Sequence, residues 1–272
     1  MRPAKSNQTC PAKAKVDPLP HPEAEKEITD PERITVPRGE ITERVRRHFD
    51  AIAKRYDLMN TLLSFGIHYL WKRQAVGLLR LGAGDRFLDL CGGTGDLSVL
   101  AARRIGPSGR IVLYDINRAM MEAGRQKSTH AGERGRVLYV QGDAQSSALQ
   151  TGSFDAAVAG FGIRNLNDRV AGLREVFRVL KPGGRFVCLE FSRPATGWFR
   201  SLYDFYSFGI MPFLGRLVVG STEAYTYLPE SIRLFPSPPE LAAVLEEIGF
   251  RRVAYRRLTD GIACLHSGVK PG

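Results

Sequence analysis

Residues 87–97 read Phe87-Leu-Asp-Leu-Cys-Gly-Gly-Thr-Gly-Asp-Leu97, and they are the most informative part of the sequence about the fold class. A hydrophobic run ends with an acidic residue, and a glycine-rich turn follows it and leads into a segment with a helical pattern. Such a turn leaves backbone N–H groups and a surface of close approach facing a ligand. The next apolar run, Ile111-Val-Leu-Tyr-Asp115, also ends in a carboxylate, which suits ribose hydroxyls. Together they predict an adenosine-containing cofactor at the carboxyl ends of parallel strands.

Strands and helices alternate along the rest of the chain, after two helices around residues 41–56 and 71–81. The predicted strands are 86–90, 111–115, 137–141, 154–159, 186–191, 252–255 and 262–266, and the predicted helices are 96–104, 117–127, 169–180 and 239–248. This order predicts an α/β fold with a doubly wound, mostly parallel, seven-stranded sheet. A short turn at 258–261 makes the last two strands a hairpin, so one strand near the edge is antiparallel. That arrangement is typical of class I methyltransferases.

Composition narrows the class of protein. The net charge of +11 favours anionic surfaces such as membrane lipids, nucleic acid or an acidic partner, and charges scattered over solvated faces are the open alternative. The four cysteines include no Cys-x-x-Cys pair, which favours reduced thiols in a cytosolic protein. No secretory signal is visible in the first forty residues.

Residues 1–38 are predicted to be a disordered tail, because seven of the 16 prolines fall there among lysines and glutamates. We expect residues 39–272 to form one domain with an N-terminal helical cap and a substrate-side insertion at 197–235. The apolar stretch in this insertion is too short and too interrupted to span a bilayer, which takes roughly 20 apolar residues.

The glycine-rich turn departs from the dinucleotide pattern. Gly93 and Gly95 supply the first two glycines of Gly-x-Gly-x-x-Gly, but Ser98 stands at the third. Asp89, at the end of the strand, would repel a pyrophosphate. A carboxylate there suits a positively charged group, such as the amino group of S-adenosylmethionine (SAM).

A third strand ends in Gln141-Gly-Asp-Ala144. There Asp143 can accept from an adenine amino group, and the backbone N–H of Ala144 can donate. With Asp89 and Asp115, Asp143 completes a set of strand-end carboxylates that predicts one cofactor cleft. The open alternative is that the three aspartates act as helix caps.

With these residues in view, the chain resembles the ubiquinone/menaquinone-biosynthesis C-methyltransferase family, from about Ile41 to His266. The segments that carry the resemblance are Tyr56-Asp-Leu-Met-Asn60 with Ser64, His68 and Trp71; Phe161-Gly-Ile-Arg-Asn165; Arg178-Val-Leu-Lys-Pro-Gly-Gly184 with Glu190 and Ser192; and Tyr227-Leu-Pro-Glu-Ser-Ile-Arg233. The resemblance implies that Thr94, Asp115, Asp143 and Ala144 contact SAM.

The resemblance further implies SAM-dependent C-methylation of the ring of demethylmenaquinol to menaquinol, without a metal. The alternative substrate is the 2-polyprenyl-6-methoxy-1,4-benzoquinol intermediate of ubiquinone biosynthesis. A ring hydroxyl must share or lose its proton, and Arg164 can stabilise the resulting anion. Asn165 would orient the hydroxyl, and His68 or water would act as the base. Tyr56 would line the ring pocket. The alternatives are a structural role for His68 and a simple helix end at Tyr56.

A polyprenylated hydroquinone stays in the membrane, so we expect a cytoplasmic protein in peripheral contact with the inner face of the membrane. The aromatic stretch at 199–219 would form a lid or tail groove, and core packing is the alternative that the sequence favours slightly. A homo-oligomer is compatible with the sequence.

Three further functions compete with this one. A nucleic-acid base methyltransferase is disfavoured, because Gly160-Phe-Gly-Ile-Arg-Asn165 replaces the Asn/Asp-Pro-Pro-aromatic segment of amino-methylating enzymes. We therefore expect no nucleic-acid partner. A small-molecule O-methyltransferase and a non-enzymatic SAM-binding module stay open, although both are less favoured.

Overall fold

The computed structural model describes residues 49–50, 53–133, 135–219 and 223–272. The predicted tail at 1–38 and most of the predicted first helix at 41–56 lie outside these residues.

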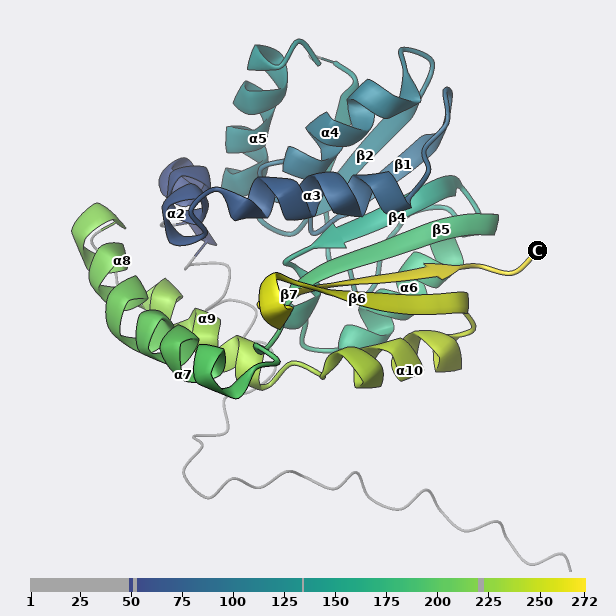
Figure 1. The fold of residues 1–272 in the computed structure, drawn as a ribbon. Helices are drawn as coiled ribbons and strands as arrows, with labels where there is room; N and C mark the ends of the chain where they lie inside the picture. The colour runs from purple at the N-terminus through teal and green to yellow at the C-terminus, as the bar shows by residue number, and fades with distance from the viewer. Residues whose placement is uncertain (1–48, 51–52, 134, 220–222) are drawn as a thin grey trace, which may run out of the picture. The chain divides into compact units, whose positions relative to one another are not determined.

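The centre of the fold is a seven-stranded sheet in the order β3-β2-β1-β4-β5-β7-β6 (Figure 1). Strands β1 to β5 pair in parallel, and β7 runs antiparallel to both of its neighbours. This confirms the predicted sheet, including the terminal hairpin. The strands are β1 (Arg86–Leu90), β2 (Arg110–Asp115), β3 (Val137–Gln141), β4 (Phe154–Gly160), β5 (Leu180–Phe191), β6 (Arg251–Leu258) and β7 (Ala263–Val269).

Helices cover both faces of the sheet (Figure 1). One face packs against α3, α4 and α5, and the other against α6 and α10. The helices are η1 (Ala53–Arg55), α2 (Tyr56–Leu63), α3 (Ile67–Leu78), α4 (Asp96–Ile105), α5 (Arg118–His130), η2 (Ile163–Asn165), α6 (Arg169–Val179), α7 (Gly197–Phe205), the π-helical turn η3 (Tyr206–Ile210), α8 (Met211–Val219), α9 (Glu223–Arg233), α10 (Pro238–Ile248) and η4 (Thr259–Gly261).

Strand β5 begins at Leu180, six residues before the predicted start at 186. Its register against β4 shifts between Phe154 and Ala156, so that residues 181–184 form an irregular first part of the strand. These residues read Lys-Pro-Gly-Gly, a composition that indicates a turn when only the sequence is considered. The sequence therefore predicted the regular half of the strand and missed the irregular half.

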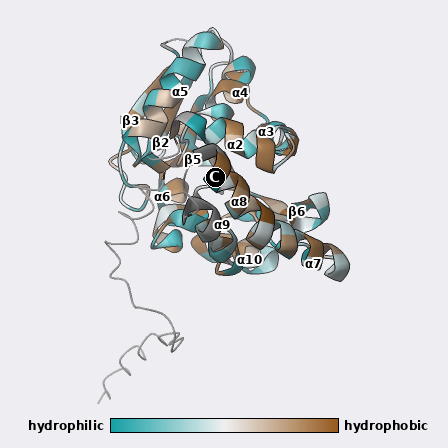
Figure 2. Ribbon diagram, turned by 90° about the vertical axis from the view of Figure 1, so that its left-hand side faces the viewer, coloured by the Kyte–Doolittle hydropathy of each residue, from teal (hydrophilic) through white to brown (hydrophobic). Residues whose placement is uncertain are grey.

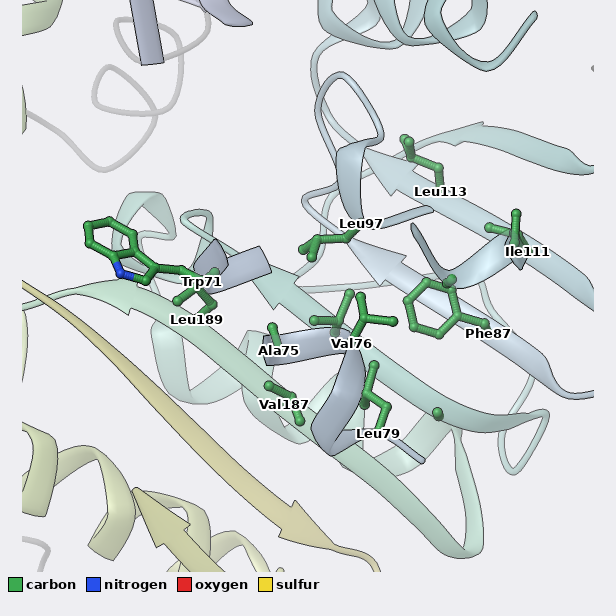
Figure 3. Packing of buried hydrophobic residues seen from close by; sticks show 14 of the residues in the cluster. Trp71, Ala75, Val76, Leu79, Phe87, Leu97, Ile111, Leu113, Val187 and Leu189 are labelled. Atoms are coloured by element: carbon green, nitrogen blue, oxygen red, sulfur yellow. The ribbon is translucent and has the colours of Figure 1, made fainter. Parts of the chain in front are cut away.

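Alternating side chains of the strands build two hydrophobic layers. Figure 3 shows the layer beneath α3, where Trp71, Ala75 and Leu79 lie over Val187 and Leu189 of β5. The spacing of the α3 residues places them on one face of the helix. This packing fixes α3 across the sheet, with its first turn near the carboxyl ends of the strands.

Helices α7, α8 and α9, with the turn η3, form the insertion between β5 and α10 (Figure 1). Helix α7, described in full, has no buried residue. Trp198 is 72% exposed and Phe205 is 68% exposed. Figure 2 shows hydrophobic residues along α7 and α8. Core packing therefore does not describe α7, although its Phe199 and Tyr203 are half-buried and line the apolar pocket, whereas Met211 of α8 is buried in a small cluster with Met59 and Leu63.

Candidate active site

Two adjoining cavities lie where the parallel strands end. The cofactor pocket, of about 120 Å³, is lined by the ends of β1 and β2 and by the segments after β3 and β4. The apolar pocket, of about 740 Å³, lies between α2, α3 and the insertion. Phe49, Tyr56, Lys72 and Phe161 line both cavities. A ligand group in one can therefore reach the other.

The predicted site residues divide between these cavities. The cofactor pocket is lined by Asp89, Gly93, Thr94, Asp115, Asp143, Ala144 and Asn165, and the apolar pocket by His68 and Arg164, with Tyr56 between them. Gly95 does not line either cavity among the described residues. It is the N-cap of α4, with φ of +78°, a conformation that glycine adopts readily.

Asp89 is fully buried at the end of β1. Its Oδ2 accepts hydrogen bonds from the backbone N–H and the hydroxyl of Ser98, at 2.9 and 2.7 Å. Its Oδ1 is buried and has no hydrogen-bond partner among the described residues. Burial raises the pKa of this carboxyl to about 7. Asp89 thus offers one buried oxygen for which a charged donor from a ligand would be the natural partner.

Asp115 holds the turn and the start of α5 together. Its Oδ2 accepts from Gly93 N at 2.8 Å and its Oδ1 from Asn117 N at 2.7 Å. Asn117, and not Asp115, is the side-chain cap of α5, since its Oδ1 accepts from Met120 N. Burial raises the pKa of Asp115. Each carboxylate oxygen keeps a further lone pair for a ligand hydroxyl.

Asp143 is oriented by Gln145, whose side-chain amide donates to both carboxylate oxygens at 2.9 and 3.1 Å. The side-chain oxygen of Gln145, Oε1, accepts a hydrogen bond from the backbone N–H of Asp168, at the start of α6. No helix follows β3 directly, and α4 is capped by Gly95. The helix-cap alternative therefore fits Asp89 in part, because Asp89 accepts from the backbone N–H of Ser98 in the first turn of α4, but it does not account for Asp143.

Close packing joins the turn after β1 to the segment after β4. Cys91 has φ of +54°, a left-handed conformation that is rare for a residue with a side chain. A Cβ on Gly162 would lie 2.3 Å from Cys91 Cβ, so only glycine fits there. This contact holds η2, which carries Arg164 and Asn165, against the cofactor turn.

A network of charges anchors α2 and α3 to the same turn. Thr94 Oγ1 donates to Asp57 Oδ1 at 2.8 Å and accepts from Lys127 Nζ at 3.0 Å. Lys127 also pairs with Asp57 and Asp96, and Lys72 pairs with Asp96. Although burial opposes it, the two lysines lower the pKa of Asp96 to about 2. Because the only hydroxyl proton of Thr94 goes to Asp57, the side chain has no proton left to donate to a ligand.

Arg164 is buried beside the apolar pocket. Its Nη1 donates to Glu190 Oε2 at 3.0 Å and to Phe161 O, and its backbone N–H donates to Glu190 Oε1 at 3.1 Å. Its guanidinium carbon lies 5.3 Å from the ring centre of Phe191. Burial opposes the charge, but Glu190 raises the pKa of Arg164. Arg164 Nε is buried and has no acceptor among the described residues.

His68 lies on α3 and is 3% exposed. Ser64 Oγ donates its proton to Asn60 O at 2.6 Å, so it accepts from His68 Nδ1 at 2.7 Å. This tautomer leaves His68 Nε2 as an acceptor. Burial, assisted by the charge of Lys72, lowers the pKa of His68 to about 4. Such a pKa makes His68 a poor proton acceptor and argues against the predicted role as a base.

Aromatic rings form the wall between α3 and the sheet. Phe161 and Phe191 pack with ring centres 4.4 Å apart, and Trp71 lies 6.4 and 6.3 Å from them. Asn165, at the junction of the two cavities, accepts a hydrogen bond from the Tyr227 hydroxyl at 3.3 Å. Flat apolar walls beside a buried guanidinium suit a planar ring that carries an oxygen.

Sequence reasoning missed two sets of residues. It gives no role to Glu190 beyond its place in a segment, and it does not single out Asp57, Asp96 or Lys127. Their roles depend on contacts between distant parts of the chain, such as the 26-residue separation of Arg164 and Glu190. The one available signal was a glutamate within the apolar run that closes the strand, between Leu189 and Phe191.

The chemistry of the cofactor pocket fits SAM. The buried Oδ1 of Asp89 suits the amino group, Asp115 the ribose hydroxyls and Asp143 the adenine amino group. Within the described part of the chain, no cluster of three or more His, Cys, Asp or Glu side chains could hold a metal ion. No helix in the described ranges is long and apolar enough to cross a membrane.

The sheet topology and the two cavities define a class I SAM-dependent methyltransferase. The model of the ubiE/COQ5 methyltransferase family matches residues 39–270, and the chain belongs to this family. It is a SAM-dependent C-methyltransferase. Relatives named ubiquinone/menaquinone biosynthesis C-methyltransferase UbiE, from Pseudomonas paraeruginosa (strain PA7) and Pseudomonas fluorescens (strain Pf0-1), are each 44% identical over 236 residues. These alignments cover 87% of this chain and 92% of each relative.

Solved structures share the fold at low identity. The [4+2]-cyclase SpnF has a TM-score of 0.62 at 16% identity, over 85% of this chain and 96% of its own. A SAM-dependent methyltransferase from Thermotoga maritima, described as a possible histamine N-methyltransferase, has a TM-score of 0.57 at 20% identity. The match covers 82% of this chain and 97% of the other. Such similarity establishes the fold and leaves the substrate to be argued from the site.

Proposed function

We propose that the enzyme methylates a ring carbon of demethylmenaquinol, and that the 2-polyprenyl-6-methoxy-1,4-benzoquinol of ubiquinone biosynthesis is the alternative substrate. The names of the 44% identical relatives refer to both pathways, which supports a quinol of this class. The observation that carries the proposal is the unpartnered Nε of Arg164, buried beside an aromatic-walled pocket that adjoins the cofactor pocket.

SAM supplies the methyl group, which becomes bonded to the ring carbon as its bond to sulfur breaks. The protein's task is to make that carbon electron-rich. A phenolic hydroxyl has a pKa of about 10, so ionisation at neutral pH requires roughly 4 kcal/mol of anion stabilisation. Arg164 Nε would donate to the phenolate oxygen inside a pocket with apolar walls, where such a bond is strong.

The remaining polar groups orient the ring. His68 Nε2 would accept from the second ring hydroxyl, because His68 Nδ1 already donates to Ser64. Asn165 would position the reacting edge at the junction of the cavities. Tyr56 would close the pocket over the ring, since it lines both cavities. With His68 a weak base, the hydroxyl proton and later the ring proton leave to water.

Contact with the membrane surface is the second part of the proposal. Apolar side chains of α2, of the turn between α2 and α3, of α7 and of α8 are exposed beside the apolar pocket, which would admit a prenyl chain from the bilayer. We define the apolar rim as Leu58, Leu62, Phe65, Trp198, Leu202, Phe205, Phe213 and Leu217, each at least 46% exposed. Exposed aromatic and apolar residues of this density are typical of surfaces that bind other molecules or membranes. This supports peripheral contact with a membrane surface, which we propose to be the cytoplasmic face.

The substrate is tested with methyl-labelled SAM and chemically reduced quinols in detergent, with mass-spectrometric analysis of the product. We expect label on a ring carbon of demethylmenaquinol. Label only on the ubiquinone precursor would move the enzyme to the alternative pathway. Label on an oxygen would identify an O-methyltransferase, and SAM binding without any product would support a non-enzymatic module.

A further inference from the structure

We infer that Glu190 is a positioning residue that sets the acidity of the bound ring hydroxyl by holding and partly neutralising Arg164. The inference rests on the proposed function. Glu190 lies at the end of β5 and is 1% exposed. It stands behind Arg164, outside the set of described residues that line the apolar pocket.

Glu190 fixes the orientation of Arg164 through two separate contacts. One oxygen accepts from the backbone N–H of Arg164 and the other from its guanidinium, at 3.1 and 3.0 Å. The second oxygen also accepts from Phe191 N at 3.2 Å. The ring of Phe191 lies along the guanidinium. Glu190 and Phe161 occupy Nη1, whereas Nε has no acceptor among the described residues. Because Arg164 lines the apolar pocket, Nε would be the donor that a bound ring hydroxyl uses.

Glu190 also supplies a compensating charge. Without it, the buried guanidinium would be an unpaired cation, which is costly in a low-dielectric site. With Glu190 present, a phenolate bound at Arg164 would interact with a guanidinium whose positive charge is partly neutralised by the Glu190 carboxylate. The bound hydroxyl is therefore made more acidic than in water, but less acidic than it would be beside Arg164 alone.

The charge and the reach of Glu190 can be separated by two variants. Glu190→Gln keeps the length and removes the charge, whereas Glu190→Asp keeps the charge and shortens the side chain. The matched control is Glu175→Gln, which removes the acid of the Arg178–Glu175 pair on α6, an element that does not border the apolar pocket among the described residues. All variants are first compared by thermal unfolding and by SAM affinity.

The readout is the pKa of a bound phenol, independent of turnover. A redox-stable 1-naphthol with a geranyl chain is bound with S-adenosylhomocysteine, and its naphtholate absorption is titrated. We expect a lowered naphthol pKa in the wild type and in Glu175→Gln, and a value lower by about one further pH unit in Glu190→Gln. Glu190→Asp is expected to bind the naphthol about tenfold more weakly and to shift the naphthol pKa back toward its value in water, because Arg164 is no longer held in place.

An unchanged naphthol pKa in folded Glu190→Gln would overturn the inference. If that variant does not fold, Glu190→Asp decides, and wild-type affinity for the naphthol would overturn the inference. Failure of the proposed function is distinct, because the wild-type enzyme itself would then neither lower the naphthol pKa nor methylate a quinol.

Discussion

Thr94 Oγ1 donates a hydrogen bond to Asp57 Oδ1 at 2.8 Å, and this contact joins the glycine-rich turn to helix α2. Lys127 bridges the same two side chains. Asp57 directly follows Tyr56, which lines both cavities. The turn that would hold SAM and the helix that covers the ring pocket are therefore connected by one polar network.

Removal of this contact should weaken both sites together. In Asp57→Ala, we expect the affinity for SAM and for the quinol each to fall about fivefold, and the free energy of unfolding to fall by about 1 kcal/mol, since Asp57 is partly exposed. Calorimetry and thermal unfolding measure these changes. Glu122→Ala, in the exposed pair with Arg118, is the control that should change neither affinity. Unaltered SAM and quinol affinities in Asp57→Ala would refute the connection.

SAM binding should depend on pH through Asp89. Its pKa of about 7 means that Asp89 is increasingly protonated below pH 7, whereas an ammonium group requires the carboxylate. The association constant should therefore rise with pH from 5.5 to 7.5, by nearly tenfold per unit at the acid end, with release of a proton. Calorimetry in buffers of different ionisation enthalpy counts that proton. Asp89→Asn should bind SAM weakly, and its association constant for SAM should not rise with pH. A flat profile in the wild type would contradict this role.

His68 should behave as a hydrogen-bond acceptor and not as a base. The substitution His68→Asn retains a donor toward Ser64 and removes the acceptor Nε2. We expect the KM for the quinol to rise about fivefold in this variant, the value of one hydrogen bond of about 1 kcal/mol. The shape of the pH profile of kcat/KM from pH 6 to 9 should not change, because a group with a pKa of about 4 stays neutral there. If the pH dependence of kcat/KM near pH 6.5 disappeared in His68→Asn, His68 would instead be identified as the base.

The apolar rim should matter only when the substrate lies in a membrane. We expect the double variant Trp198→Ser, Phe213→Ser to bind anionic phospholipid vesicles at least fivefold more weakly in co-sedimentation. It should retain activity on a short-chain quinol in detergent. Leu138→Ser is the matched control, since Leu138 is 61% exposed on β3, remote from the rim. Equal vesicle binding by the rim variant and the control would remove the rim from membrane contact.

Local patterns were sufficient to predict the sheet and the cofactor cleft. Strands β1 and β2 end in Asp89 and Asp115, and parallel strands bring such ends together, so the cleft follows from topology. The family resemblance implied that Thr94 contacts SAM, but it could not reveal that the Thr94 hydroxyl is already bonded to Asp57, 37 residues away.

The pKa values and the charge pairs could not be read from the sequence. The pKa of His68 depends on burial and on Lys72, and both follow from the way α3 packs on the sheet. The pairing of Glu190 with Arg164 likewise requires β5 to lie beside the segment after β4. The exposure of α7 was also unpredictable, because an aromatic-rich helix reads the same whether it packs in a core or stands at a surface.

The most direct test of the account is the single-turnover rate of ring methylation of demethylmenaquinol by Arg164→Ala with saturating labelled SAM. We expect a loss of at least about 100-fold, typical of the removal of one donor to a developing oxyanion, with SAM affinity within twofold of the wild type. A rate within tenfold of the wild type, at unchanged SAM affinity, would contradict the claim that Arg164 activates the ring.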